Sequence, residues 1–186
     1  MQKTYIGITG ASGVLGKQIL KIKDNIKYIS YKGDIRSKNK IKKWFKENDF
    51  DAIFHLAAIV PIKKVNNNKL RALNVNYEGT KNIVNEVIKH NIKWFFFSST
   101  SHVYYYSKKK ISEKFELKPL SYYGYTKKKA ESYIEKKLKK KNNIQYCIGR
   151  IFSISNKSQK KNFLIPDLKK KIMNKKKIIL LKNLNH

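Results

Sequence analysis

Thr9-Gly10-Ala11-Ser12-Gly13-Val14-Leu15-Gly16 carries three glycines at a spacing of three residues, directly after the apolar run Tyr5–Thr9. The run is typical of a buried strand, and the apolar spacing from Val14 to Ile22 is typical of a helix. In such a turn the first glycine permits a tight bend, the second lets backbone N–H groups approach a pyrophosphate, and the third allows close helix packing. The helix N-terminus would then face the phosphates. This context predicts a dinucleotide-binding turn, although glycine-rich turns also occur without ligands.

Strand-like and helix-like patterns alternate along the chain. The expected strands are Tyr5–Thr9, Ile26–Tyr31, Ala52–Leu56, Lys93–Ser98, Ile144–Arg150 and Ile178–Leu181. Between them, Ile83–Lys89 and Lys127–Lys140 show the clearest amphipathic helical spacing. The alternation predicts an α/β fold, a Rossmann-like doubly wound parallel sheet with helices on both faces.

The composition limits the classes of partner. The 186 residues suffice for one domain with a sizeable core, and the net charge is +31. Only Arg36, Arg71 and Arg150 are arginines, and the lysines are scattered from Lys3 to Lys182. A dedicated nucleic-acid surface would concentrate charge and use more arginine. We therefore expect no specific nucleic-acid binding, and we interpret the lysine runs of the second helix as its solvated face in preference to a membrane-binding one.

The cysteine content and the hydropathy of the chain indicate its cellular compartment. Cys147 is the only cysteine, which rules out an intrachain disulfide and a cysteine-cluster metal site, and we expect no bound metal. No apolar run is long enough to cross a bilayer, and the N-terminus has the pattern of a strand and not of a signal peptide. These features predict a cytoplasmic protein without membrane contact.

A cluster of hydroxyl side chains follows the apolar run Trp94–Phe97, in Ser98-Ser99-Thr100-Ser101-His102-Val103-Tyr104. Ligands of open α/β sheets bind at the carboxyl ends of the strands. Farther along, Tyr123 and Lys127 stand four residues apart, and such a pair meets on one helix face. A nearby ammonium should lower the pKa of the phenol and make it a usable acid/base. Eight of the twelve tyrosines have a lysine four residues later, so the setting Pro119–Lys127, and not the spacing, singles out Tyr123.

In the order of its motifs, the chain resembles the extended short-chain dehydrogenase/reductases, in particular their nucleotide-sugar epimerase/dehydratase group. Its segments are similar to the T-G-x-x-G-x-x-G turn, the G-D-[IL]-R element, the H-x-A-A strand end, the N-x-x-G-T helix, the S-S-x-x-x-V-Y strand, the Y-x-x-x-K pair and the R-x-x-[NS] strand. In the same order as these motifs, the matching segments are Thr9–Gly16, Gly33–Arg36, His55–Ala58, Asn76–Thr80, Ser98–Tyr104, Tyr123–Lys127 and Gly149–Ser153.

The resemblance implies a catalytic set. Tyr123 would exchange a proton with a sugar oxygen while hydride moves to or from nicotinamide, Thr100 would hydrogen-bond the same oxygen, and Lys127 would bind the ribose. We expect His55 to be a hydrogen-bonded structural histidine in the cofactor wall and Asn76 to be structural or water-ordering. The expected cofactor-binding residues are Gly10, Ser12, Gly13, Val14, Leu15, Gly16, Lys32, Asp34, Ile35, Arg36, Leu56, Ala57, Ala58, Asn76, Ser98 and Lys127.

Cofactor preference is indicated by the end of the second expected strand. An NAD site usually places an acidic residue there, about 20 residues after the glycine turn, to bind the ribose 2′-hydroxyl. Tyr31 and Lys32 occupy that place, and the resemblance assigns Asp34 to adenine. Because Lys32 and Arg36 would accommodate a 2′-phosphate, the sequence slightly favours NADP over NAD.

Departures from the family pattern limit which of the family's activities can be expected of this chain. Its 4,6-dehydratases hold an Asp-Glu pair after the catalytic Thr, where this chain has Ser101 and His102, so we expect epimerisation or carbonyl reduction and not dehydration. Residues 1–152 are expected to form the NAD(P)-binding domain, and residues 153–186 only the start of a truncated C-terminal substrate lobe. A homodimer through two helices per subunit is a further implication. The alternatives are a cofactor-binding but catalytically silent module and, third, a basic nucleic-acid-binding protein.

Overall fold

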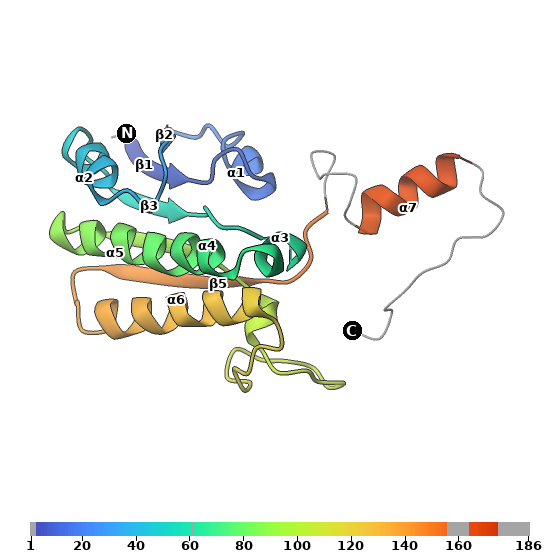
Figure 1. The fold of residues 1–186 in the computed structure, drawn as a ribbon. Coiled ribbons are helices and arrows are strands. Elements are labelled where there is room, and N and C mark those ends of the chain that lie inside the picture. The colour runs from blue at the N-terminus through green and yellow to red at the C-terminus, as the bar shows by residue number, and fades with distance from the viewer. Residues whose placement is uncertain (1–2, 61, 156–163, 175–186) are drawn as a thin grey trace. The chain divides into compact units, whose positions relative to one another are not determined.

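The computed structural model describes residues 3–60, 62–155 and 164–174 of the chain. The chain divides into two compact units, Met1–Phe152 and Ser153–His186, which are considered separately. The first unit is built on five strands, all parallel, in the order β2-β1-β3-β4-β5 (Figure 1). Their bounds are β1 Thr4–Thr9, β2 Ile26–Ser30, β3 Ala52–His55, β4 Trp94–Thr100 and β5 Gln145–Ile151.

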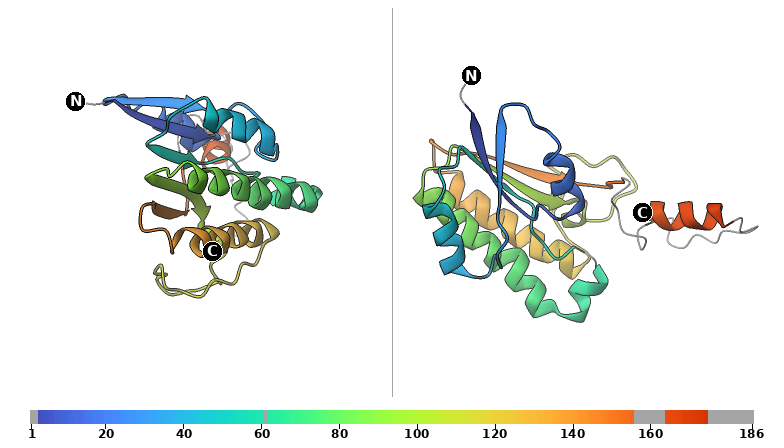
Figure 2. Two further views of the ribbon diagram at one scale, coloured as in Figure 1. Left: turned by 90° about the vertical axis from the view of Figure 1, so that its left-hand side faces the viewer. Right: turned by 90° about the horizontal axis from the view of Figure 1, so that it is seen from above.

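Helices cover both faces of this sheet, as the alternating pattern predicts. Helices α2, α5 and α6 pack side by side in one layer (Figure 2). The connections from β2 to β3, from β3 to β4 and from β4 to β5 all run one way across the sheet, whereas the connection from β1 to β2 runs the other way. Right-handed crossovers therefore put α1 on the face opposite to α2, α5 and α6. The helical elements of the first unit are α1 Val14–Ile19, α2 Lys38–Lys46, α3 Ile62–Asn67, α4 Lys69–Leu73, the π-helical turn η1 Asn74–Glu78, α5 Gly79–Lys89, the 3-10 turn η2 Ser101–Val103 and α6 Tyr122–Leu138.

The main core lies between the sheet and the layer of α2, α5 and α6. Because side chains alternate across a strand, Phe95 and Phe97 of β4 point into this layer beside Ile53 of β3. The expected apolar faces of α5 and α6 meet them, and Ile83, Val87 and Ile134 are fully buried. On the opposite face, Phe54, Trp94 and Phe96 form an aromatic cluster with ring centroids 5.5–6.2 Å apart.

The element boundaries differ from the expected ones at a few places. The helix expected over Lys127–Lys140 begins five residues earlier, at Tyr122, because the Ser121 hydroxyl accepts a hydrogen bond from the Gly124 N–H (3.1 Å) and caps it. The second unit contains α7, Leu164–Met173, where the alternating pattern predicts a helix without fixing its bounds. The expected strand Ile178–Leu181 lies outside the described residues. Within the described part of the chain, every helix is too short or too polar to span a lipid bilayer.

Candidate active site

The glycine turn after β1 is tightly folded on one side and open on the other. Gly10 has a φ of +73°, and a Cβ there would lie 2.6 Å from the Ala57 backbone nitrogen. A side chain would therefore be excluded from this position by both strain and overlap. At Gly13, which is exposed, an added Cβ would meet only the Gly10 carbonyl. The exposed Ser12 adjoins this opening, and Val14 and Leu15 are half-buried at the start of α1.

A buried chain of hydrogen bonds joins β1, β3 and the start of α5. Thr80 donates its hydroxyl to the Asn76 carbonyl (2.7 Å), so its oxygen accepts from Nε2–H of His55 (2.9 Å). His55 Nδ1 then accepts from the Thr9 hydroxyl (2.6 Å). Burial, and secondarily the charge of Lys127, lower the pKa of His55 to about 3. His55 is thus the neutral, hydrogen-bonded structural histidine that the sequence indicates.

Asn76 lies in η1 and joins the segment after β3 to α6. Its carbonyl oxygen accepts from the Ile59 N–H (2.7 Å), and its amide donates to the Ile59 carbonyl (3.1 Å) and the Thr126 hydroxyl (3.0 Å). The side chain is 0% exposed, and both of its N–H groups are used. This arrangement fits the structural role expected of Asn76, and direct cofactor contact by this residue stays a prediction.

Thr100, at the end of β4, and Tyr123, in the first turn of α6, are brought together by a close backbone approach. A Cβ at Gly124 would overlap the carbonyl of His102 in η2, so only glycine lets α6 begin there. Burial raises the pKa of Tyr123, and a hydrogen bond with Thr100 acts in the opposite direction. We expected Lys127 to lower this pKa. That expectation was wrong, because burial dominates the shift and the opposing influence comes from Thr100.

Lys127 lies one turn after Tyr123 and is almost completely enclosed, with 2% of its surface exposed. Its Nζ sits 3.9 Å above the centroid of the Phe97 ring. Burial lowers its pKa to about 7, against the opposing influence of Glu131. Among the described residues, no hydrogen-bond acceptor and no carboxylate within ion-pair distance meets this Nζ. The site therefore holds a buried ammonium with unused donors.

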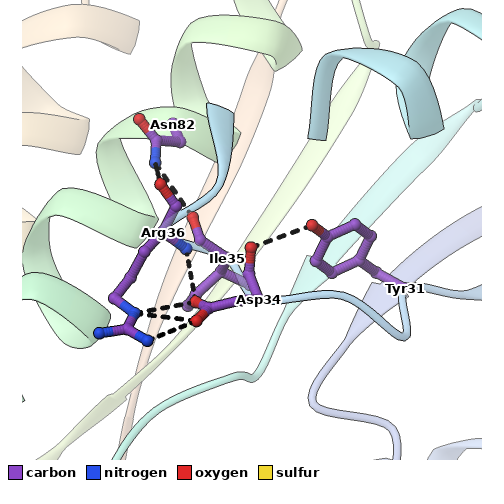
Figure 3. A network of polar contacts seen from close by, with 5 residues as sticks. All are labelled: Tyr31, Asp34, Ile35, Arg36 and Asn82. Carbon is purple, nitrogen blue, oxygen red and sulfur yellow. Dashed lines mark hydrogen bonds and ion pairs between the residues drawn. The ribbon is translucent and has the colours of Figure 1, made fainter. Parts of the chain in front are cut away.

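Figure 3 shows how the segment after β2 is fixed. The Arg36 guanidinium grips the Asp34 carboxylate, with Nη2 to Oδ2 at 2.6 Å, and this contact lowers the pKa of Asp34 to about 2. Tyr31 donates its hydroxyl to the Asp34 carbonyl (3.1 Å), and Asn82 donates to the carbonyls of Ile35 and Arg36 (3.0 and 3.3 Å). The Ile35 side chain is buried in the core, which leaves its backbone for any ligand contact.

The remaining expected cofactor-binding residues lie near the carboxyl ends of the strands. Leu56, Ala57 and Ala58 follow β3 and are half-buried, and Ala57 donates its N–H to the Thr9 hydroxyl (3.3 Å). Ser98 is half-buried on β4, and Lys32 is exposed after β2. Because all five strands are parallel, the glycine turn, the ends of β3 and β4 and the first turn of α6 meet at one edge of the sheet (Figure 1).

Sequence reasoning missed Glu131, which stands one turn after Lys127 with 1% of its surface exposed. Its carboxylate accepts from the Ser99 hydroxyl and forms a fork with Arg150, with Nη2 to Oε2 at 2.9 Å and Nε to Oε2 at 3.1 Å. Arg150 also donates to the Tyr104 hydroxyl (3.1 Å) and the Glu113 carbonyl (2.9 Å). The available signal was an acidic residue that continues the four-residue spacing of Tyr123 and Lys127 along the apolar face of α6.

Comparisons with known proteins identify the family of the chain. The model of the NAD dependent epimerase/dehydratase family matches residues 6–186. Over 96 residues the chain is 35% identical to the bifunctional UDP-glucose 4-epimerase and UDP-xylose 4-epimerase 1 of Pisum sativum, a stretch covering 51% of this chain and 27% of that protein.

Solved structures share the fold at lower identity. RMD from Pseudomonas aeruginosa, complexed with NADPH, has a TM-score of 0.83 at 21% identity, covering 93% of this chain and 62% of that chain. The UDP-N-acetylglucosamine 4-epimerase from Methanobrevibacter ruminantium M1, in complex with UDP-N-acetylmuramic acid, has a TM-score of 0.80 at 22% identity, covering 94% and 64%. The matched part is thus less than two thirds of the length of each of these relatives.

Proposed function

Because the chain belongs to the NAD-dependent epimerase/dehydratase family, we propose that it is an NAD(P)-dependent enzyme that epimerises or reduces a nucleotide-linked sugar. Thr100, Tyr123 and Lys127 form its catalytic site. The glycine turn Gly10–Gly16 and the segments after β2 and β3 bind the cofactor.

The observation that carries this proposal is the buried ammonium of Lys127. A charge that is removed from water without a protein partner costs several kcal/mol. Such a cost is tolerated at functional sites, where a bound ligand supplies the missing partners. Ribose hydroxyl groups of a dinucleotide are suitable acceptors, and they would reach Lys127 from the edge of the sheet where the glycine turn lies.

The residues divide the chemistry between them. The bound nicotinamide would give or accept hydride at a carbon of the sugar. The Tyr123 phenol, which burial keeps protonated near neutrality, would donate its proton to the oxygen on that carbon and recover it in the reverse direction. Thr100 would hydrogen-bond the same oxygen and hold it in line. Lys127 would bind the ribose hydroxyl groups of the cofactor and so help to orient the nicotinamide.

Replacing Tyr123 with Phe tests the proposal. We expect turnover of UDP-sugars to fall by about 10²-fold or more, while NAD(P)H affinity stays unchanged, because only the proton-transfer group is lost. Tyr125→Phe is the matched control, since Tyr125 lies in the same turn of α6 but is exposed. Cofactor binding with no turnover in the parent chain would instead favour the catalytically silent module.

For the cofactor, we propose a preference for NADP over NAD. Lys32 is exposed, the Arg36 side chain is 42% exposed, and the carboxylate of Asp34 is already engaged by Arg36. A 2′-phosphate would therefore find cations here more readily than a hydroxyl would find a free carboxylate. Lys32→Glu with Arg36→Glu should weaken NADPH binding far more than NADH binding in calorimetric titrations. The control is Lys38→Glu with Lys40→Glu, two exposed lysines of α2; equal losses for both cofactors would refute the preference.

A further inference from the structure

Glu131 has no part in the chemistry proposed above, yet it is one of the most deeply buried charged groups of the first unit. Tyr123, Lys127 and Glu131 follow one another at intervals of four residues and so share one face of α6. That face packs on the carboxyl ends of β4 and β5, from which Ser99 and Arg150 reach the carboxylate.

The contacts of Glu131 connect β4, α6 and β5 at the catalytic part of the candidate site. Ser99 directly precedes Thr100, so its hydrogen bond to Glu131 ties the end of β4 to α6. Arg150 neutralises the carboxylate from β5 and extends the connection to Tyr104, beyond η2. Hydrogen bonds to Glu131 and Tyr104 outweigh the effect of burial and raise the pKa of Arg150. Arg150 is therefore charged across the accessible pH range.

We infer that Glu131 is a positioning residue of the active site, which holds Thr100 against Tyr123 through Ser99 and, one helical turn from Lys127, favours the positive charge of that side chain. The inference rests on the proposed function for its catalytic meaning, but the arrangement itself is independent of any ligand. Two further titratable groups face Lys127. His55 on β3 is neutral, and Tyr123 on α6 has a raised pKa, so neither supplies a counter-charge near neutrality. Glu131 alone among these groups opposes the effect of burial on the pKa of Lys127.

The test is a titration of the cofactor-free protein labelled with ¹³C at the lysine side chains. The buried lysine should titrate with a midpoint of about 7, apart from the exposed lysines, and Lys127→Met should remove its signal. In Glu131→Gln, which keeps the shape but removes the charge, the midpoint should move to lower pH. Glu135→Gln is the matched control, since Glu135 stands one turn later on the exposed face of α6. An unchanged midpoint in Glu131→Gln would overturn the inference.

A second variant guards against misfolding caused by an unpaired Arg150. In the double variant Glu131→Gln, Arg150→Gln the guanidinium that Glu131 had paired is absent, and the same downward shift is expected because Glu131, and not Arg150, acts on Lys127. A double variant that folds and keeps the wild-type midpoint would also overturn the inference.

Cofactor binding gives a separate readout. In fluorescence titrations with NADPH, wild-type affinity should fall as the pH rises through the Lys127 midpoint, and Glu131→Gln should lose affinity of the order of tenfold at pH about 8. Glu131→Asp, which retains the charge, should restore most of it. If the wild-type chain bound no NADPH at all, the proposed function would fail, whereas the lysine titration would still decide the role of Glu131.

Discussion

At the residue scale, His55 illustrates how a polar side chain can be buried in the middle of a site without taking part in its chemistry. Both ring nitrogens are hydrogen-bonded, to Thr9 and Thr80, and each bond has a defined direction because Thr80 itself donates to the Asn76 carbonyl. Protonation would place a donor at Nδ1, where an acceptor is required. The hydrogen-bond chain therefore depends on a neutral imidazole.

This dependence predicts acid sensitivity. The pKa of His55 is about 3 in the folded chain and about 6.5 when unfolded, so below pH 6.5 the unfolded chain binds a proton that the folded chain does not. Stability is then lost as the pH falls through this window, by about 2 kcal/mol between pH 7 and pH 5. Urea denaturation at the two pH values measures the loss. His55→Gln should flatten the dependence; a parallel dependence in wild type and His55→Gln would refute the assignment.

How far single residues could be assigned from sequence depended on whether their partners are close in the chain. Tyr123 and Lys127 are neighbours on one helix, and their setting distinguishes them from the many other Tyr–Lys pairs. Glu131 meets Ser99 and Arg150, which are 32 and 19 residues away, and no local pattern encodes such contacts. For the same reason the sequence did not reveal that the side-chain amide of Asn76 is hydrogen-bonded to Ile59 and Thr126.

At the element scale, periodicity predicted the five strands and the buried faces of α5 and α6, because burial on one side imposes a repeat of two or 3.6 residues. The start of α6 was placed too late, because its first turn is specified by packing and not by periodicity. Ser121 caps the helix, Tyr123 is buried, and Gly124 lies against the carbonyl of His102.

This packing makes Gly124 the most sensitive position of the helix start. Gly124→Ala would force the first turn of α6 away from η2, because a Cβ would overlap backbone that has no freedom to move. We expect a loss of about 1–3 kcal/mol in the free energy of unfolding and a larger loss of turnover, since Tyr123 would withdraw from Thr100. Thermal and urea unfolding with a UDP-sugar assay measure both. Ser132→Ala, a small substitution at an exposed position of the same helix, should change neither the free energy of unfolding nor the turnover. Wild-type turnover in Gly124→Ala would show that the close approach of α6 to η2 is not needed for activity.

At the scale of the whole molecule, the net charge of +31 attracts any polyanion, and this attraction must be separated from the cofactor site. The positive charge is spread along the chain, whereas the dinucleotide site depends on the local shape of the turn at Gly13. Nonspecific attraction to a duplex depends on the release of counterions and is therefore steeply reduced by salt. Binding of a small ligand in a specific site releases few counterions, so salt should weaken it much less.

The two kinds of binding should consequently respond differently to salt and to mutation. From about 50 to about 200 mM NaCl, duplex DNA affinity should fall by about 10³-fold or more if six or more phosphates are contacted, whereas NADPH affinity should fall by less than about tenfold. Gly13→Trp should abolish NADPH binding, because it fills the open side of the turn, and should leave the duplex titration unchanged. Calorimetry with NADPH and fluorescence anisotropy with a labelled duplex measure the two affinities. Duplex binding that persists at about 200 mM salt with NADPH at saturation would favour a nucleic-acid-binding protein, in which the Rossmann-like sheet serves only as a scaffold.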